Sequence, residues 1–453
     1  MKIEQLYTGC LAEAAYYIES DPYVKMASDQ GAKIKYIFET HFHADFVSGH
    51  VDLAKKTDAT IVYGPEAKTN YDVHVAEDGE EFKIGKLTLK VLHTPGHTLE
   101  SSTYLLTDED GKNRGIFTGD TLFIGDVGRP DLAIKSDVTK EDLAGMLFDS
   151  LRNKIMPLED DITVYPAHGA GSSCGKNMSS ETTDTLGNQK KTNYALREGM
   201  TKEEFVKEVT EGILPPPQYF AKNAMLNKMG YEEVDEVISR GNNALSVEEV
   251  EKAVADGALV LDVRDPQEFA QGFIPNSTFI GLEGMFAIWV GTIIKDLQQP
   301  IVLVAPEGRE EEAVLRLARV GYDKTAGYID GGFDAWAKAG KPVDVIHSIP
   351  ATEFAERMKE ESLMVLDVRK NSEHLSEHVI GAQNFPVDFI NEKLKELDSQ
   401  PTYYVHCAGG YRSMIAASIM KRNGYDLVDI AGGFKAIAET DAPKSEYVCP
   451  STL

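Results

Sequence analysis

The segment ETHFHADFVSGH, residues 39–50, places His41, His43 and Asp45 at alternate positions after the apolar-edged run KIKYIF. Imidazole nitrogens and carboxylate oxygens are common ligands of zinc and iron in proteins. The residue after Asp45 is Phe46, and a phenyl ring cannot bind a metal ion. The spacing therefore indicates a metal site that has no ligand at this last position.

Further candidate ligands follow later apolar runs. His97 lies in HTPGHTLES, Asp120 in FTGDTLF and His168 in YPAHGAG. Loops at the ends of strands bring together side chains from distant parts of a chain. A single histidine is more often a hydrogen-bonded structural residue, but that interpretation is poor for the whole ordered set. We therefore expect these loops to form one metal centre.

The ordered set resembles the metallo-β-lactamase superfamily, over roughly residues 1–175. Dinuclear members, such as glyoxalase II, use His-x-His-x-Asp-His, and the last histidine is Phe46 here. Asp45 and His168 alone would hold a second metal weakly, so we expect one ion. Two histidines and one carboxylate with open positions suit a non-haem Fe(II) oxygenase, whereas paired hydrolytic zinc needs the missing ligand.

The segment GDTLFIGDVGRPDL narrows this resemblance to the persulfide dioxygenases. Carried over position by position, the iron ligands of that family fall on His41, His97 and Asp120. The resemblance therefore implies one Fe(II) per chain. A site with four ligands that includes His43 stays open. Three members of the set are expected to surround the ligands or to join them: His43, Asp45 and His168.

Two further residues are candidate substrate contacts. Arg129 in VGRPDL either binds a carboxylate of the substrate or pairs with a neighbouring aspartate, Asp126 or Asp131. Cys174 in GAGSSCGKNMSS is either a loop thiol without consequence or a residue near the iron that handles substrate sulfur. Both alternatives stay open for each residue.

The second half of the chain contains an internal repeat. The segment ALVLDVRDPQEFAQGFIPNS around Asp262 returns as LMVLDVRKNSEHLSEHVIGA around Asp367, after 105 residues. In each copy β-branched runs alternate with helix-like segments, which predicts a parallel α/β sheet. We therefore expect three domains, residues 1–240, 241–348 and 349–453.

The second copy carries the segment VHCAGGYRSMIAAS, in which Cys407 ends a strand and Arg412 and Ser413 open a helix. A glycine loop aims N–H groups inward at a helix amino terminus, and with a guanidinium beside it this favours a thiolate. An inert, buried cysteine is therefore the poorer interpretation. The spacing C-x-x-G-x-R-S resembles that of rhodaneses, sulfurtransferases whose cysteine carries sulfur as a persulfide. The resemblance implies a catalytic role for Cys407, Arg412 and Ser413.

The matching loop of the first copy, VAPEGREEEA, has Ala305 in the place of Cys407 and Glu310 near the place of Arg412. It has no nucleophile, so this copy resembles inactive rhodanese domains that serve as structural or docking modules. The fold class expected for the whole chain is α/β, with a metallo-β-lactamase αββα sandwich followed by two rhodanese-like parallel-sheet domains.

The composition limits the classes of partner. The chain has 46 Lys and Arg against 73 Asp and Glu, a net charge of -27, and no basic run that could follow a phosphate backbone. We therefore expect no nucleic-acid partner. No apolar run reaches the ~18 residues of a membrane span, and the first residues lack a secretory pattern, so we expect a cytoplasmic protein without membrane contact.

The four cysteines are scattered and form no C-x-x-C pair, which suits a reducing compartment better than a disulfide framework. Cys174 and Cys407 are discussed above. Of the other two, Cys10 is assigned to packing and Cys449 to the tail.

Together the parts resemble a persulfide dioxygenase fused to a tandem rhodanese. The resemblance implies that Fe(II) and O2 oxidise the terminal sulfur of a small-thiol persulfide to sulfite, and that Cys407 passes sulfane sulfur to sulfite, which gives thiosulfate. The expected partners are thus a thiol persulfide, O2 and sulfite, and we expect a homo-oligomer. The sequence does not select among glutathione, coenzyme A, bacillithiol and cysteine as the thiol.

Two alternatives stay open. The first is a glyoxalase II-like thioester hydrolase with added sulfur-carrier domains, which would contain two zinc ions. The second is a non-oxidative sulfur carrier or sensor that uses Cys407 and keeps the first domain as a scaffold. Metal content distinguishes the hydrolase, and oxygen consumption distinguishes the carrier.

Overall fold

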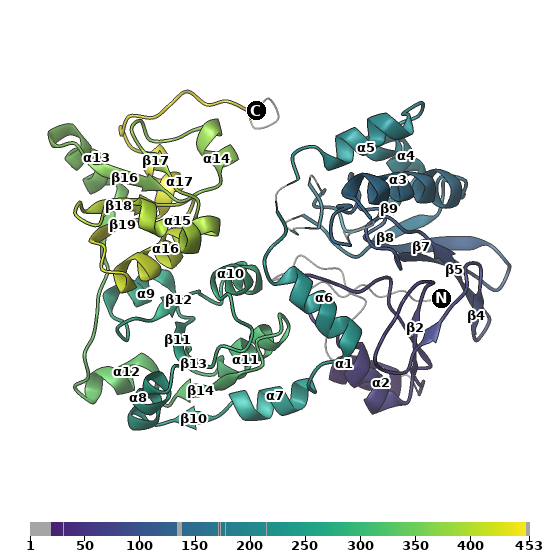
Figure 1. Ribbon diagram of the computed structural model, residues 1–453, viewed down its shortest axis with the longest axis horizontal. Coiled ribbons are helices and arrows are strands. Elements are labelled where there is room, and N and C mark those ends of the chain that lie inside the picture. Colours follow the sequence, from purple (N-terminus) through teal and green to yellow (C-terminus); the bar gives the residue numbers. More distant parts are fainter. Residues whose placement is uncertain are drawn as a thin grey trace. The chain divides into compact units, whose positions relative to one another are not determined.

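The computed structural model describes residues 20–29, 31–133, 138–170, 172, 174–176, 178–213 and 215–449. The chain divides into two compact units, Met1–Val234 with Arg319–Gly321 and Asp235–Ala318 with Tyr322–Leu453 (Figure 1). Cys10 lies outside the described residues. In the described part of the chain, no helix is both long enough and apolar enough to cross a membrane.

The first unit contains two sheets. A parallel three-stranded sheet has the order β1 (Tyr36–Phe38), β2 (Thr60–Tyr63), β3 (His74–Val75). A six-stranded sheet has the order β4 (Glu81–Ile84), β5 (Leu87–His93), β6 (Ser102–Thr107), β7 (Asn113–Gly119), β8 (Thr163–Pro166), β9 (Asp184–Thr185). Its strands are antiparallel except for the parallel pair of β7 and β8. The apolar runs of the sequence thus form strands, as expected.

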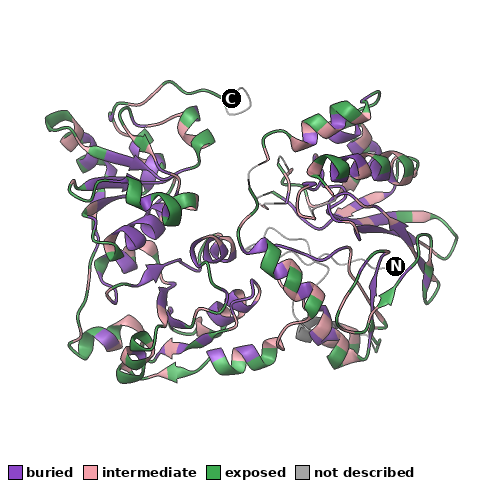
Figure 2. Cartoon of the chain, viewed as in Figure 1, coloured by how far each residue is buried: buried purple, intermediate pink, exposed green. Residues whose placement is uncertain are grey.

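Side chains on both faces of strand β6 are buried, because alternate residues of the strand enter two different cores. Figure 2 colours the chain by burial and shows the buried residues gathered in the interior of the unit. Leu105 lies in a core shared with helices α3 (Lys140–Ser150) and α5 (Lys202–Thr210). Tyr104 and Leu106 lie in a second core, which includes Val62 of β2. The two sheets therefore face each other across this second core, and helices cover the outer face of the larger sheet.

The remaining helices of the first unit frame the sheets. They are α1 (Ser20–Asp29), α2 (His50–Thr57), α4 (Leu186–Thr192) and α6 (Phe220–Met229), with a π turn at Leu151–Ile155 and a 3-10 turn at Tyr194–Leu196. Helix α5 starts with a capping box, in which Thr201 and Glu204 bond each other's backbone N–H. Helix α7 (Val234–Gly241) runs across the boundary between the units.

The second unit contains two parallel five-stranded sheets that have the same strand order. The first is β10 (Ala244–Leu245), β14 (Thr325–Ile329), β13 (Ile301–Val304), β11 (Leu259–Asp262), β12 (Thr278–Phe279). The second is β15 (His347–Pro350), β19 (Leu427–Ala431), β18 (Tyr403–His406), β16 (Met364–Asp367), β17 (Gln383–Asn384). The expected parallel sheets and the internal repeat are therefore both present.

The helices also correspond between the copies. The first copy has α8 (Val247–Ala255), α9 (Pro266–Gln271), α10 (Phe286–Ile293), α11 (Glu310–Ala318) and α12 (Gly332–Lys338). The second has α13 (Ala351–Glu360), α14 (Asn371–Ser376), α15 (Ile390–Lys393), α16 (Tyr411–Arg422) and α17 (Gly433–Ala438). The repeated Asp-Val-Arg forms the same bidentate ion pair in each, with guanidinium NH2 2.6 Å from the carboxylate in Asp262–Arg264 and in Asp367–Arg369.

Candidate metal centre and sulfur-transfer loop

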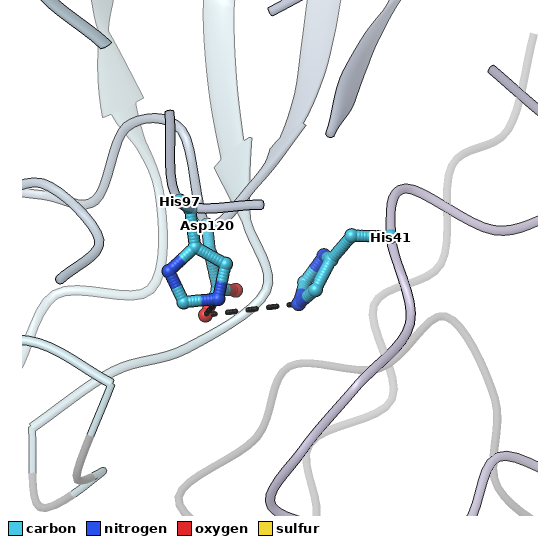
Figure 3. A group of neighbouring side chains, drawn as sticks. All are labelled: His41, His97 and Asp120. Carbon is cyan, nitrogen blue, oxygen red and sulfur yellow. Dashed lines mark ion pairs between the residues drawn. The ribbon is translucent and has the colours of Figure 1, made fainter. Parts of the chain in front are cut away.

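The predicted iron ligands come together although they are far apart in the sequence. His41, His97 and Asp120 lie in the loops after β1, β5 and β7, and their ligand atoms lie within 4.8 Å of one another (Figure 3). The Nε2 atom of His97 is 3.3 Å, and that of His41 3.9 Å, from Oδ2 of Asp120. All three side chains are buried. The strand ends therefore deliver two imidazoles and a carboxylate to one point.

Hydrogen bonds orient both imidazole rings toward this point. Nδ1 of His97 lies 2.9 Å from the carbonyl oxygen of Arg129, and Nδ1 of His41 lies 3.0 Å from Oγ1 of Thr40. A carbonyl oxygen can only accept, so Nδ1 of His97 is the donor in this bond, and Nε2 is the ring atom that faces Asp120. A metal-binding histidine is held in this way, with its other ring nitrogen hydrogen-bonded.

The electrostatic setting of the cluster fits a bound cation. Burial, followed by the charges of neighbouring histidines, holds the pKa of His41 and of His43 well below the ordinary value, so both rings are neutral. Neither carboxylate oxygen of Asp120 accepts a hydrogen bond within the described part of the chain. A buried carboxylate with no donor is costly, whereas a metal ion between it and two imidazole lone pairs satisfies all three groups.

A second group of donors lies next to the first. The ligand atoms of His43, Asp45 and His168 lie within 4.8 Å of one another. Nε2 of His168 is 3.4 Å from Oδ2 of Asp45 and 3.5 Å from Oδ1 of Asp120. Two donors, Asp45 and His168, were expected at this second position from the sequence, and the fold brings His43 to it as a third. Which members of the cluster bind metal stays a prediction.

Phe46 packs against the second donor group and cannot bind a metal ion. Its side chain is buried, and its ring lies over the ring of His43 with a centroid distance of 4.4 Å and an interplanar angle of 37°. An apolar ring therefore fills the place that a fourth donor would take.

The structure also places the two candidate substrate contacts. Arg129 binds Asp131, with Nε 2.6 Å from Oδ1 and NH2 2.8 Å from Oδ2, which is the ion-pair alternative. The buried Cys174 forms a third donor group with Asp120 and His168. Burial raises the pKa of the Cys174 thiol well above its ordinary value, and the carboxylates of Asp45 and Asp120 raise it further. Cys174 therefore lies beside the cluster and is not a distant loop thiol.

Two residues that hold the histidine loop were missed in the sequence. The side-chain amide of Asn227 on α6 donates to the carbonyl oxygens of His43 (2.8 Å) and Phe46 (2.7 Å), and it accepts from the N–H of Ser48 (2.8 Å). Glu100 accepts from the N–H of Phe42 at 3.1 Å. Neither is part of a ligand pattern, and their partners are set by tertiary contacts, so the sequence carried no signal for them.

The sulfur-transfer candidate, Cys407, directly follows β18 and is buried. The N–H of Gly410 donates to its Sγ atom at 3.1 Å, and Gly410 has a left-handed φ of 101° at the start of α16. The carbonyl oxygen of Cys407 accepts from the N–H of Phe434 at 2.6 Å. A Cβ atom on the neighbouring Gly433 would lie 2.5 Å from that oxygen, so only glycine fits there. The loop therefore points the backbone N–H of Gly410 at the sulfur atom of Cys407.

The two other predicted members of the loop have side-chain partners. Ser413 donates to the carbonyl oxygen of Gly410 at 3.1 Å and lies 2.9 Å from Oδ1 of Asp429, so it fixes the turn. Arg412 binds Glu373 on α14 through NH1 and NH2. Asp429 and Glu373 were not singled out in the sequence.

The first copy lacks this chemistry. Ala305 follows β13 as Cys407 follows β18, and α11 begins at Glu310 where α16 begins at Tyr411. The copies touch through the Tyr411 hydroxyl, which donates to the carbonyl oxygen of Gly281 at 2.7 Å. The first copy therefore contacts the cysteine loop of the second without adding a nucleophile.

Comparison with known proteins agrees with this division. The model of the metallo-beta-lactamase superfamily matches residues 8–168, and that of the rhodanese-like domain matches residues 246–339 and 350–440. The solved structure of a metallo-beta-lactamase from Staphylococcus aureus subsp. aureus COL is 30% identical with a TM-score of 0.64, over 72% of this chain and 97% of that chain. The chain belongs to the metallo-β-lactamase superfamily and carries tandem rhodanese-like domains. The expected fusion and fold class are thus confirmed.

Two kinds of curated relative bear on the function. The mitochondrial persulfide dioxygenase ETHE1 of Homo sapiens is 29% identical over 43% of this chain and 68% of its own length. A hydroxyacylglutathione hydrolase of Dictyostelium discoideum is 36% identical over 30% of this chain, which spans 48% of that hydrolase. With the rhodanese-like domains, these similarities support an enzyme of sulfur metabolism that acts on small sulfur compounds.

Proposed function

We propose that this protein oxidises a low-molecular-weight thiol persulfide with O2 and then transfers sulfane sulfur to the sulfite that is formed. The balanced first reaction is RSSH + O2 + H2O giving RSH, SO3²⁻ and two protons. The observation that carries the proposal is the buried group of two histidines and one carboxylate, His41, His97 and Asp120, in which the carboxylate has no hydrogen-bond donor in the described residues.

Fe(II) fits this donor set, and when bound it would supply one-electron chemistry with O2 and a position for the persulfide sulfur. The residues of the chain provide the setting. His97 is fixed by the carbonyl oxygen of Arg129, and His41 by Thr40. The buried ring of Phe46 packs against His43 and offers no ligand atom. In this proposal Cys174 contacts substrate sulfur, and His43, Asp45 and His168 hold protons and water beside the ligands.

In the second reaction Cys407 is the sulfur carrier. Its thiolate attacks the outer sulfur of a persulfide, a new S–S bond forms, and the small thiol leaves with the electron pair of the old bond. Sulfite then attacks the outer sulfur of the Cys407 persulfide, which releases thiosulfate and the Cys407 thiolate. The loop N–H of Gly410 stabilises the sulfur anion in both steps, and the copy with Ala305 has a structural role. We propose domains at 1–240, 241–348 and 349–453.

A thioester hydrolase is the second candidate function. It is favoured by the similarity to hydroxyacylglutathione hydrolases and by the second donor group, His43, Asp45 and His168, which could hold another metal ion. Phe46 argues against it, because the residue next to Asp45 carries no ligand atom.

Metal analysis tests the proposal against this alternative. Protein purified without oxygen should contain about one iron per chain, the number that one complete two-histidine, one-carboxylate set can hold. Two zinc ions per chain, together with hydrolysis of a thioester, would favour the hydrolase.

A further inference from the structure

The guanidinium beside Cys407 is already engaged by a carboxylate. NH1 of Arg412 lies 2.6 Å from Oε2 of Glu373, and NH2 lies 2.8 Å from Oε1. The two side chains come from α16 and α14, and they are 17% and 34% exposed. The parallel pair of N–H groups that would bind an oxyanion is therefore occupied by the protein itself.

Glu373 is ionised in this setting. Burial raises the pKa of its carboxyl, but the bonds and charge of Arg412 and the N–H of Lys370 outweigh burial, so its pKa is below the ordinary value. The N–H of Lys370 lies 3.2 Å from Oε2. Asp388 adds a second carboxylate near Arg412, and its buried Oδ2 has no hydrogen-bond partner within the described residues. Arg412 therefore faces two carboxyl groups, those of Glu373 and Asp388.

This charge balance affects the reaction because sulfite and thiosulfate are anions. A guanidinium with a free pair of N–H groups would bind either of them. With Glu373 in place, an anion that enters must displace a carboxylate, and it also meets the charge of that carboxylate.

We propose that Glu373 is a specificity-determining residue of the Cys407 loop, which lowers its affinity for anions and so favours thiol persulfides over thiosulfate as sulfur donors. This inference rests on the sulfur-transfer function proposed above. The same pair would help a newly formed thiosulfate dianion to leave, because Glu373 competes with the dianion for Arg412.

The test compares the rates at which anionic iodoacetate and neutral iodoacetamide alkylate Cys407 in the full-length protein. Mass spectrometry of the Cys407 peptide measures both rates. The ratio of the two rates reports the local charge, and a general change in thiol reactivity cancels from it. Glu373→Gln should raise the ratio about five-fold, as expected for one nearby charge. Glu373→Asp keeps the charge, so its ratio should stay near that of the wild type.

Glu353 provides the matched control, because it forms an exposed pair with Arg357 on α13, with NH2 2.7 Å from Oε1. Glu353→Gln changes the net charge by the same amount and should leave the ratio unchanged. An unchanged ratio in Glu373→Gln, or an equal rise in Glu353→Gln, would overturn the inference.

Sulfur transfer from thiosulfate to cyanide gives a second readout. Glu373→Gln should lower KM for thiosulfate several-fold with little change in kcat, and an unchanged KM would overturn the inference. If the alkylation ratio rises as expected while the wild type and every variant transfer no sulfur, the anion preference is supported and the proposed transfer function fails.

Discussion

Single residues carry the proposed oxidative chemistry, and Asp120 is the most informative of them. It lies within 4 Å of Nε2 of both His41 and His97, at 3.9 and 3.3 Å. Its carboxylate oxygens accept no hydrogen bond from the described residues, so a metal ion is the partner that accounts for its burial.

Asp120→Ala should therefore remove bound iron and abolish oxygen uptake, because two imidazoles alone hold Fe(II) weakly. Sulfur transfer through Cys407 should persist, since that loop belongs to the other compact unit. Iron content, an oxygen electrode and a thiosulfate–cyanide assay on one preparation measure all three. Oxygen uptake that survives the substitution would remove Asp120 from the ligand set.

His406 gives a prediction about pH. Burial lowers its pKa to about 4, although Asp367 acts in the opposite direction. An unfolded chain protonates this histidine below about pH 6.5, whereas the folded chain does not, so folding loses stability as pH falls from 6.5 toward 4. At the acid end the loss is roughly 3 kcal/mol.

Denaturant unfolding of His406→Gln and wild-type protein at several pH values tests this contribution. The free energy of unfolding should fall less steeply in the variant between pH 6.5 and 4.5. Equal slopes for the two proteins would mean that His406 titrates normally in the folded chain.

At the scale of elements, Asn227 on helix α6 holds the histidine loop, which carries His43 and Phe46. Asn227→Asp keeps the shape of the side chain but removes the donors to the carbonyl oxygens of His43 and Phe46. Metal affinity should fall about 10- to 100-fold, as for the loss of other groups that support metal ligands. Asn188→Asp is a control, because the exposed Asn188 on α4 donates to the half-buried Asp184 on β9. Competition with a chelator measures the metal affinity of both variants. Equal metal affinities in Asn227→Asp and Asn188→Asp would mean that the bonds from Asn227 to the histidine loop do not support metal binding.

The sequence predicted the elements better than their contacts. Strands such as β5 and β6 follow from apolar runs, and the repeat of Asp-Val-Arg predicted two equal sheets, because periodicity and repetition are local properties. The ligand loops followed from strand ends. Asn227 and Glu373 could not be found in this way, since each acts on a loop distant in sequence, and a lone polar residue on a helix has no recognisable spacing. The grouping of His43 with Asp45 and His168 could not be read from the sequence either, because it is set by tertiary contacts.

At the scale of the whole molecule, fusion of the domains makes chemical sense because the product of one proposed reaction is the acceptor of the other. Cys407→Ser should leave the metal ligands intact and oxygen uptake unchanged, while the product changes from mostly thiosulfate to mostly sulfite. A serine hydroxyl forms no persulfide, and its high pKa leaves almost no anion at neutral pH. Sulfur-product analysis with a sulfite scavenger controls for uncatalysed thiosulfate formation. If the variant still formed thiosulfate enzymatically at the wild-type rate, another thiol, such as Cys174, would be the sulfur carrier.

The proposed oxidation is tested by the oxygen consumption of iron-loaded protein with a panel of thiol persulfides. One O2 should be taken up and one sulfur oxyanion formed for each persulfide oxidised, with the preferred thiol identified by the highest kcat/KM. Thioester hydrolysis with no oxygen uptake for any persulfide would contradict the proposal.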